Sequence, residues 1–197
     1  MTTIAVLGNG RVGSNLAAAL ARAGHEVTVA DRTPGVADAA RTARIVINAT
    51  PGAGSLDRLT ALREELRDKI LVDVSNATTD GPDGLPADLI YPGSSLAEQL
   101  QEALPETRVV KTLNTMLFPV MTSPATLPRT PTAFLSGEDP QAKQTVRGLL
   151  TDLGWQGEWI TDLGGIRTAR ATEAAVLFVP HVIRSAGFTP FAISIAR

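Results

Sequence analysis

The sequence predicts an α/β fold built on a doubly wound, mostly parallel sheet. Short β-branched runs alternate with longer helical stretches along the chain, as expected of successive strand–helix–strand units. Several strand candidates are almost continuously apolar, such as residues 45–47 and 70–72, which is typical of strands covered by helices on both faces. A glycine-rich turn also joins the first strand candidate directly to the first helix candidate.

Each element follows from its local pattern. Apolar β-branched runs predict strands over residues 3–7, 26–30, 44–49, 70–74, 108–113 and 132–136. Helical spacing of apolar residues predicts helices over residues 12–23, 36–42, 56–67, 95–103, 140–153 and 166–179. Residues 76–92 and 119–131 are predicted loops, and loops of this length often build sites. We expect a main domain over residues 1–160 and a small C-terminal helical lobe over residues 161–197.

The composition excludes several classes of function. The 197 residues contain no cysteine and two histidines far apart, which argues against disulfides, cysteine nucleophiles and a zinc site. Lysine and arginine number 18 against 20 acidic residues, and aromatic residues make up 4%, so we expect no nucleic-acid partner. The first residues lack a signal-peptide pattern, and no apolar stretch is long enough to span a membrane. We therefore expect a cytoplasmic protein without a metal site.

The turn after the first strand candidate reads G-x-G-x-x-G. Gly8 permits the tight turn, Gly10 lets a pyrophosphate approach the backbone, and Gly13 lets the helix pack closely on the strand. The N–H groups at the start of the following helix can then bind the phosphates. Asp31, at the end of the second strand candidate, stands where an acidic residue accepts a hydrogen bond from a ribose 2′-hydroxyl. The pattern predicts a dinucleotide site, although the glycines alone could form an ordinary strand-to-helix turn.

The choice between NAD and NADP stays open at this stage. Asp31 favours the bare ribose of NAD, whereas the neighbouring Arg32 can stack on adenine or bind a 2′-phosphate. The loops after the third and fourth strand candidates carry Thr50 and Asn76, which are expected to lie by the second ribose and the nicotinamide. Both could instead be turn residues that satisfy their own backbone.

Four segments, in order along nearly the whole chain, carry a more specific signal. They are GNGRVGSNLAAALARAGHEVTVADR at residues 8–32, VDVSNATTDG at 72–81, VVKTLNTM at 109–116, and DLGG at 162–165, followed by Thr168, Ala169, Arg170 and Glu173. Together they resemble the NADP oxidoreductases that use the deazaflavin coenzyme F420. The resemblance implies a Rossmann fold with a small C-terminal helical lobe, usually a homodimer, and hydride transfer between a nicotinamide nucleotide and a planar flavin-like or deazaflavin acceptor.

The resemblance also implies roles for individual positions. The residues expected at the nucleotide phosphates and adenosine are Gly8, Asn9, Gly10, Arg11, Val12 and Arg32. Those expected by the nicotinamide are Thr50, Pro51 and Asn76. Those expected on the acceptor side are Asn114, Thr115 and Met116.

Hydride transfer to a flavin-like ring needs no catalytic side chain, because the cofactors carry the chemistry. A carbonyl or imine acceptor would instead need a proton donor, for which Lys111, Asp73 and His181 are candidates. Lys111 could alternatively bind the phosphate of a ligand. A third possibility is an NAD(P)-sensing regulatory domain with no acceptor pocket.

Two expectations concern the C-terminal region. Arg170 and Glu173, three residues apart on a predicted helix, are expected to pair with each other. Residues 174–197 are strongly apolar, and too little chain remains to bury them internally. We therefore expect a homodimer, which is the commonest assembly of soluble oligomers.

Overall fold

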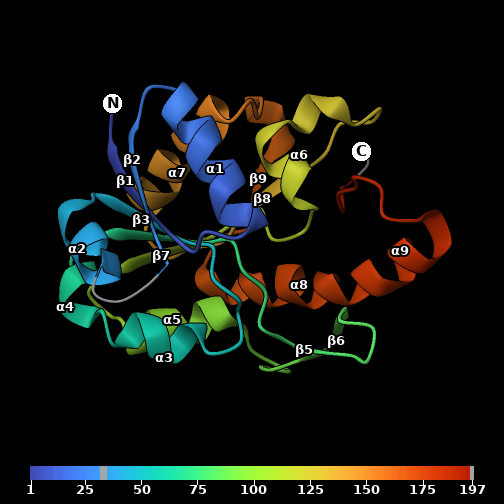
Figure 1. Cartoon of the computed structure of the whole chain (residues 1–197), viewed down its shortest axis with the longest axis horizontal. Helices are drawn as coiled ribbons and strands as arrows, with labels where there is room; N and C mark the ends of the chain where they lie inside the picture. Colours follow the sequence, from blue (N-terminus) through green and yellow to red (C-terminus); the bar gives the residue numbers. More distant parts are fainter. Residues whose placement is uncertain (32–34, 196–197) are drawn as a thin grey trace.

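A computed structural model describes residues 1–31 and 35–195. Its centre is a five-stranded parallel sheet in the order β2-β1-β3-β4-β7 (Figure 1). The strands are β1 (Thr3–Leu7), β2 (Glu26–Ala30), β3 (Ile45–Asn48), β4 (Ile70–Asp73) and β7 (Arg108–Lys111). The chain reverses its winding direction between β1 and β3, which places a topological switch point between these two strands. The predicted doubly wound α/β class is confirmed.

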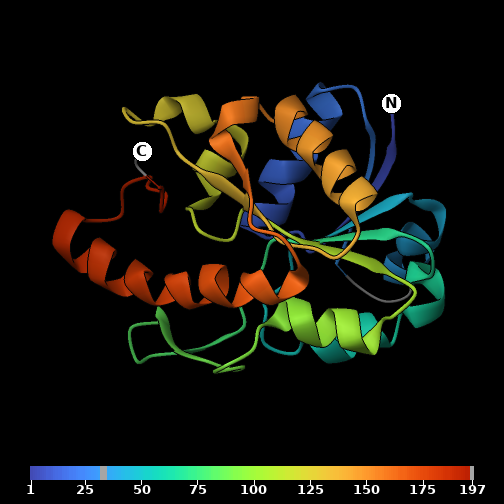
Figure 2. The same cartoon turned by 180° about the vertical axis from the view of Figure 1, so that it is seen from behind.

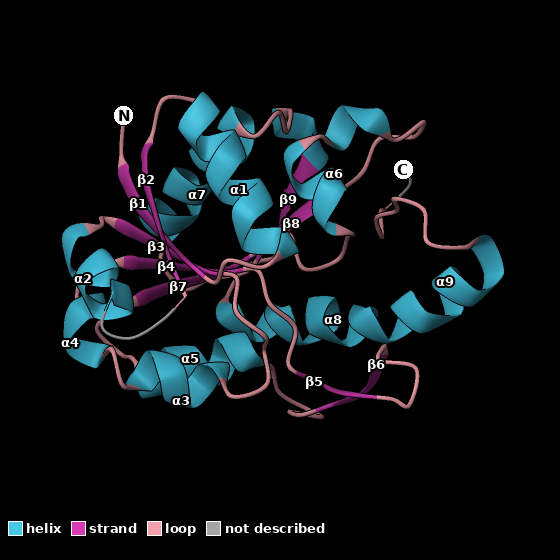
Figure 3. Cartoon of the chain, in the orientation of Figure 1, coloured by secondary structure: helices cyan, strands magenta, loops and turns pink. Residues whose placement is uncertain are grey.

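Helices cover both faces of the sheet (Figure 3). One face is covered by α1 (Arg11–Arg22), α6 (Phe118–Thr122) and α7 (Pro140–Asp152), whose apolar residues share one buried core. The other face is covered by α2 (Gly35–Thr42), α3 (Ser55–Thr60), α4 (Arg63–Leu66) and α5 (Leu96–Ala103), around a second core. Because β1, β3 and β4 are buried on both faces, their apolar runs are almost uninterrupted. Among the described residues, no helix combines the length and apolarity that crossing a bilayer requires.

Several boundaries differ from the sequence-based expectation. The helix expected over residues 56–67 is two short helices, α3 and α4. The loop expected over residues 76–92 contains a hairpin of β5 (Thr78–Asp80) and β6 (Pro86–Leu89), and α6 reaches into the loop expected over residues 119–131. The strand expected over residues 132–136 is β8 (Ala133–Leu135). It lies outside the main sheet and pairs with a strand that the sequence analysis did not predict, β9 (Ile160–Asp162). The missed strands β5 (TTD), β6 (PADL) and β9 (ITD) contain no apolar β-branched run of the kind that marks the other strands.

The C-terminal helix also runs further than expected. A helical turn over Ile166–Thr168 leads into α8 (Ala169–Ala174), and a second turn over Ala175–Phe178 joins α8 to α9 (Val179–Ala186). The whole segment forms one long rod (Figure 2). Pro180 stands in the first turn of α9, where a missing N–H group is tolerated. Gly187, with a φ of 76°, ends the helix, and the tail then returns along residues 115–117.

Candidate functional site

The loops at the carboxyl ends of the strands enclose a cleft of about 770 Å³. The loops after β1, β3, β4 and β7 all contribute, so the cleft spans the switch point, where open α/β sheets usually bind ligands. The residues that line it and that the sequence had pointed to are Gly8, Asn9, Gly10, Arg11, Val12, Asp31, Thr50, Pro51, Asn76, Asn114 and Met116. Gly13 lies below the surface of the cleft, and Arg32 lies outside the described residues.

The three glycines of the turn have different surroundings. A Cβ on Gly13 would stand 1.9 Å from the Gly8 carbonyl oxygen, and a Cβ on Gly8 would stand 2.6 Å from that of Ala49. These two positions must therefore be glycine for β1, α1 and the loop after β3 to pack together. A Cβ on Gly10, by contrast, would meet nothing within 4 Å. Gly10 precedes α1 and leaves its first N–H groups open to the cleft, a suitable arrangement for an anion.

A buried polar network supports the loop after β3. Asn48, which is fully buried, donates from Nδ2 to Asp73 Oδ1 at 2.9 Å and accepts at Oδ1 from the Thr50 hydroxyl at 2.6 Å. The Thr50 and Ser55 hydroxyls are 2.9 Å apart. A Cβ on Gly52 would stand 2.1 Å from the Asn76 carbonyl oxygen. The loops after β3 and β4 are thus in direct contact, and the network fixes the side chain of Thr50.

A reciprocal amide pair joins the loops after β4 and β7. Asn76 Nδ2 donates to the Asn114 carbonyl oxygen at 3.0 Å, and Asn114 Nδ2 donates to Asn76 Oδ1 at 2.9 Å. Both residues line the cleft. Because Asn76 and Asn114 are joined by these two hydrogen bonds, their side chains are held in a fixed orientation at the floor of the cleft.

Lys111 does not reach the cleft, which corrects its expected role in substrate binding or proton donation. Its side chain is 1% exposed, and its ammonium group donates to Asp73 at 2.8 Å, to Glu173 at 2.8 Å and to the Ser75 carbonyl oxygen. Burial lowers the pKa of Lys111, but the charges of Asp73 and Glu173 outweigh it and raise the pKa above its ordinary value. The ammonium group therefore stays protonated and enclosed. Asp73 is buried in the same network and is no donor to a ligand either.

The expected pair between Arg170 and Glu173 is also wrong. Glu173 turns inward to Lys111 and accepts hydrogen bonds from the backbone N–H groups of Leu96 and Ala97 at the start of α5. Arg170 instead donates to Glu98 on α5, with Nη2 2.7 Å from Oε1. Spacing along one helix could not reveal these partners, because both lie on a different helix or strand.

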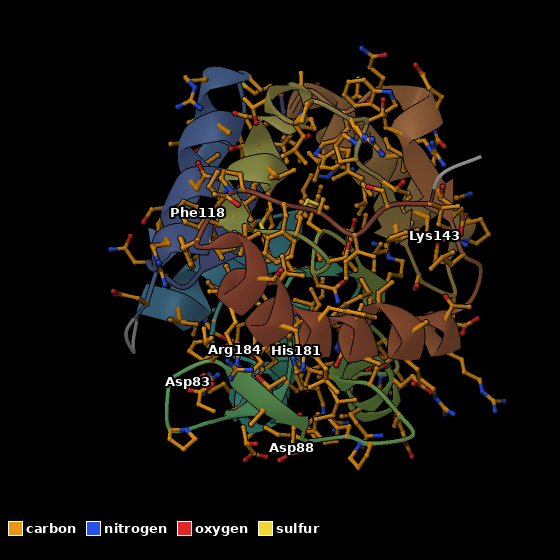
Figure 4. The ribbon with its side chains drawn as sticks, turned by 90° about the vertical axis from the view of Figure 1, so that its right-hand side faces the viewer. Asp83, Asp88, Phe118, Lys143, His181 and Arg184 are labelled. Carbon is orange, nitrogen blue, oxygen red and sulfur yellow. The ribbon has the colours of Figure 1, made fainter. Side chains whose placement is uncertain are left out.

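The outer part of the cleft is mostly apolar. Its walls come from α6 and the segment before it, from α9, from the tail and from the β5–β6 hairpin, with the side chains of Leu85, Met116, Leu117, Phe118, Met121, Val179, Ile183 and Phe188. Arg184 on α9 and Asp83 in the hairpin face each other, with Nη2 2.7 Å from Oδ2 (Figure 4). His181 is exposed on α9 and does not line the cleft. Thr115 is buried and does not line the cleft either, although its neighbours Asn114 and Met116 do.

Arg58 on α3 is a residue of the cleft that the sequence reasoning missed. It also lines a second cavity of about 440 Å³, which lies between α2, α3 and α4 and is walled mainly by apolar side chains. Asp31 and Thr50 line both cavities as well. No local pattern distinguishes Arg58 from other surface arginines in the sequence, because only the fold brings the start of α3 beside the end of β2.

A glycine turn at a helix N-terminus, set at the switch point with an acidic residue at the end of β2, defines the class. It is the arrangement of a dinucleotide-binding protein with a Rossmann fold. Residues 3–161 match the family described as the NAD binding domain of 6-phosphogluconate dehydrogenase. The chain belongs to this family.

Three individual relatives are similar to this chain to different extents. A candidate F420-dependent NADP reductase from Arthrobacter sp. FB24 is 39% identical over the whole of both chains, with a TM-score of 0.92. An F420-dependent NADP reductase from Methanocaldococcus jannaschii is 28% identical over 138 residues, which is 70% of this chain and 60% of that protein. The 3-hydroxyisobutyrate dehydrogenase of Mycobacterium tuberculosis is 19% identical with a TM-score of 0.66, a likeness of fold alone that covers 94% of this chain and 62% of that one. The family resemblance seen in the sequence is thus confirmed.

Proposed function

We propose that this protein is an NADP-dependent oxidoreductase that transfers a hydride between the nicotinamide and a planar deazaflavin or flavin-like acceptor, with F420 as the first candidate. The observation that carries the proposal is a single cleft in which the glycine turn continues into an apolar compartment. The Arthrobacter relative, which is matched over its full length, and the Methanocaldococcus relative are both described as F420-dependent NADP reductases. NAD remains the alternative nucleotide on account of Asp31.

The roles proposed for the lining residues follow the order of the loops. The diphosphate and adenosine would be held by Gly8, Asn9, Gly10, Arg11, Val12, Gly13, Asp31 and Arg32. The nicotinamide half would lie by Thr50, Pro51 and Asn76, and the acceptor would lie by Asn114 and Met116. The apolar walls from α6, α9 and the tail would exclude water from between the two rings.

The bound cofactors supply the hydride chemistry themselves, and the chain binds, orients and encloses them. Among the described residues that line the cleft, the ionisable side chains are Arg11, Asp31 and Arg58. All three are exposed, and Arg11 lies over the ring of Phe118, with Cζ 5.8 Å from its centroid. Arginine is not among the side chains that serve as general acids, and Asp31 stands at the end of β2, on the side of the second cavity. A carbonyl or imine reductase would need an acid near the acceptor, so this composition favours transfer between two rings.

A nucleotide titration and a transfer assay test the proposal. We expect the purified protein to bind NADP+ and to catalyse NADPH oxidation with F420, FMN or FAD as the acceptor. Gly10→Val should abolish nucleotide binding and leave the fold intact, since its side chain would fill only the open cleft. Gly148→Val is the matched control, because Gly148 is exposed on α7 and equally unobstructed. Absence of nucleotide binding in the wild type, or unchanged affinity in Gly10→Val, would contradict the proposal.

We also propose that the protein is a cytoplasmic homodimer that binds neither membranes nor nucleic acid, with residues 161–197 as the dimerising lobe. Phe178, Phe188 and Ile195 in this lobe are 63%, 61% and 52% exposed, an unusual degree for large apolar side chains. Light scattering at micromolar concentration is expected to give twice the mass of the chain, and the mass of a monomer would exclude this assembly.

A further inference from the structure

Asp31, Thr50 and Arg58 line both the main cleft and the smaller cavity beside it, so they border the passage between the two. The glycine turn lies on one side of this passage and the apolar pocket of α2, α3 and α4 on the other. In a bound dinucleotide the adenosine ribose connects the diphosphate to the adenine. If the proposed function holds, on which this inference rests, that ribose must lie at these three residues.

The charge of Arg58 has no acidic partner at this passage. Its Nη2 donates to the Pro51 and Ala53 carbonyl oxygens, the latter at 3.0 Å, and to the Thr50 hydroxyl at 3.3 Å. All of these acceptors are neutral. Within the part of the chain that the structure describes, no carboxylate forms an ion pair with Arg58. A positive charge is therefore left uncompensated at the wall of a ligand cavity.

The backbone is shaped to keep the guanidinium in this place. Gly54 has a left-handed φ of 73°, and a Cβ there would stand 2.8 Å from Arg58 Nη1. The bonds from Nη2 hold the group against the turn over residues 51–54, and glycine leaves the room that it occupies. The guanidinium is thus held in position before any ligand binds, which lowers the entropic cost of recruiting it.

We propose that Arg58 binds the 2′-phosphate of the adenosine ribose and so selects NADP over NAD. Nη2 of Arg58 is used by the loop, but Nε and Nη1 have no acceptor among the described residues, so they can donate to a phosphate while the positive charge attracts it. Asp31, on the same passage, acts in the opposite direction, because its carboxylate repels a phosphate and favours a bare 2′-hydroxyl. The opposition explains how a chain with an acidic residue at the end of β2 can use the phosphorylated nucleotide.

Calorimetric titration of the full chain with NADP+, NAD+, 2′,5′-ADP and 5′-AMP tests this assignment. Arg58→Met is expected to weaken binding of NADP+ and 2′,5′-ADP by about tenfold or more, and that of NAD+ and 5′-AMP by less than about threefold. Asp31→Asn should shift the preference the other way, towards NADP+. Arg63→Met is the matched control, because Arg63 is exposed on α4 and lines neither cavity.

Each alternative role for Arg58 predicts a different pattern of affinities for the four ligands. Equal weakening of all four ligands in Arg58→Met would mean that Arg58 only supports the loop, and this would overturn the assignment. A preference that is lost in Arg32→Met but kept in Arg58→Met would move the role to Arg32 and overturn it as well. Arg58→Lys, which keeps the charge and loses the guanidinium N–H groups, provides a second variant if Arg58→Met does not fold, and it should lose part of the preference. A wild type that binds none of the ligands would refute the proposed function itself.

Discussion

Replacing Lys111 with methionine isolates the energetic role of the buried charges behind the cleft. The ammonium group contacts two carboxylates, those of Asp73 and Glu173, whose side chains are 0% and 4% exposed. Methionine fills a similar volume and leaves both carboxylates without their cation. Neither can reach water without moving β4 or α8, so their desolvation is no longer offset.

The expected cost follows from this burial. Breaking a buried ion pair by removing one partner costs about 3–5 kcal/mol, and here one cation serves two acids. For a domain of this size each kcal/mol lowers the melting temperature by about 2–4 °C, so we expect a decrease of roughly 6–20 °C. Glu173→Gln in the same chain neutralises one of the two acids, and the double variant should lose less stability than the sum of the single variants.

Urea unfolding and thermal melts followed by circular dichroism measure these values. Lys143→Met is the control, because Lys143 pairs with Asp162, whose side chain is 41% exposed. That pair should contribute less than about 1 kcal/mol. If Lys111→Met lost no more free energy of unfolding than Lys143→Met, or if the double variant were strictly additive, the three charged groups would not act as a unit and the reasoning would fail.

Three further predictions follow from other contacts. Gly13→Ala should destabilise the protein by about 1–3 kcal/mol in a thermal melt, because its Cβ would stand 1.9 Å from the Gly8 carbonyl oxygen. Gly10→Ala is the control and should melt like the wild type, because its Cβ would meet nothing within 4 Å. Similar melting temperatures for the two variants would contradict this packing. Asn114→Leu removes the side-chain donor to Asn76 Oδ1, while the backbone acceptor at residue 114 stays. It should lower kcat/KM for hydride transfer by about tenfold to a hundredfold, whereas an unchanged value would show that the amide pair does not position the site. Burial raises the pKa of Glu98, but hydrogen bonds from Arg170 and Ser95 outweigh it and lower the pKa below its ordinary value of 4.5. The stabilisation is therefore present above that pH and lost as the pH falls below it, so the difference in unfolding free energy between the wild type and Arg170→Met should shrink towards about pH 3, and a difference independent of pH would refute the linkage.

The parts of the fold that the sequence predicted correctly are those with a local cause. The runs that form β1, β3 and β4 are apolar because both faces are covered, and the glycine at position 13 is required by its contact with Gly8 in the same turn. The hairpin of β5 and β6 and the strand β9 were missed because their sequences, TTD, PADL and ITD, contain no apolar β-branched run. The helix expected over residues 166–179 ends just before Pro180, whereas the observed helix continues through it, because the first turn of α9 tolerates a proline.

The residues around the cleft also differ in whether a local feature of the sequence makes their position predictable. Gly8, Asp31, Thr50 and Asn76 could be found from the sequence, since each follows the end of a strand and parallel strands end at one edge of a sheet. Lys111 follows the same rule and yet is turned away from the cleft. Its direction depends on Asp73 and Glu173, which lie 38 and 62 residues away along the chain.

Local sequence was thus sufficient for the main sheet, the glycine turn and the dinucleotide-binding class, because backbone conformation and alternating burial act over a few neighbouring residues. Packing alone brought Arg58 beside Asp31, paired Arg170 with Glu98, and folded α9 and the tail over the outer cleft. Such contacts join side chains whose spacing in the chain has no period, and their energies depend on burial. They exist only once the sheet has brought the loops and helices together.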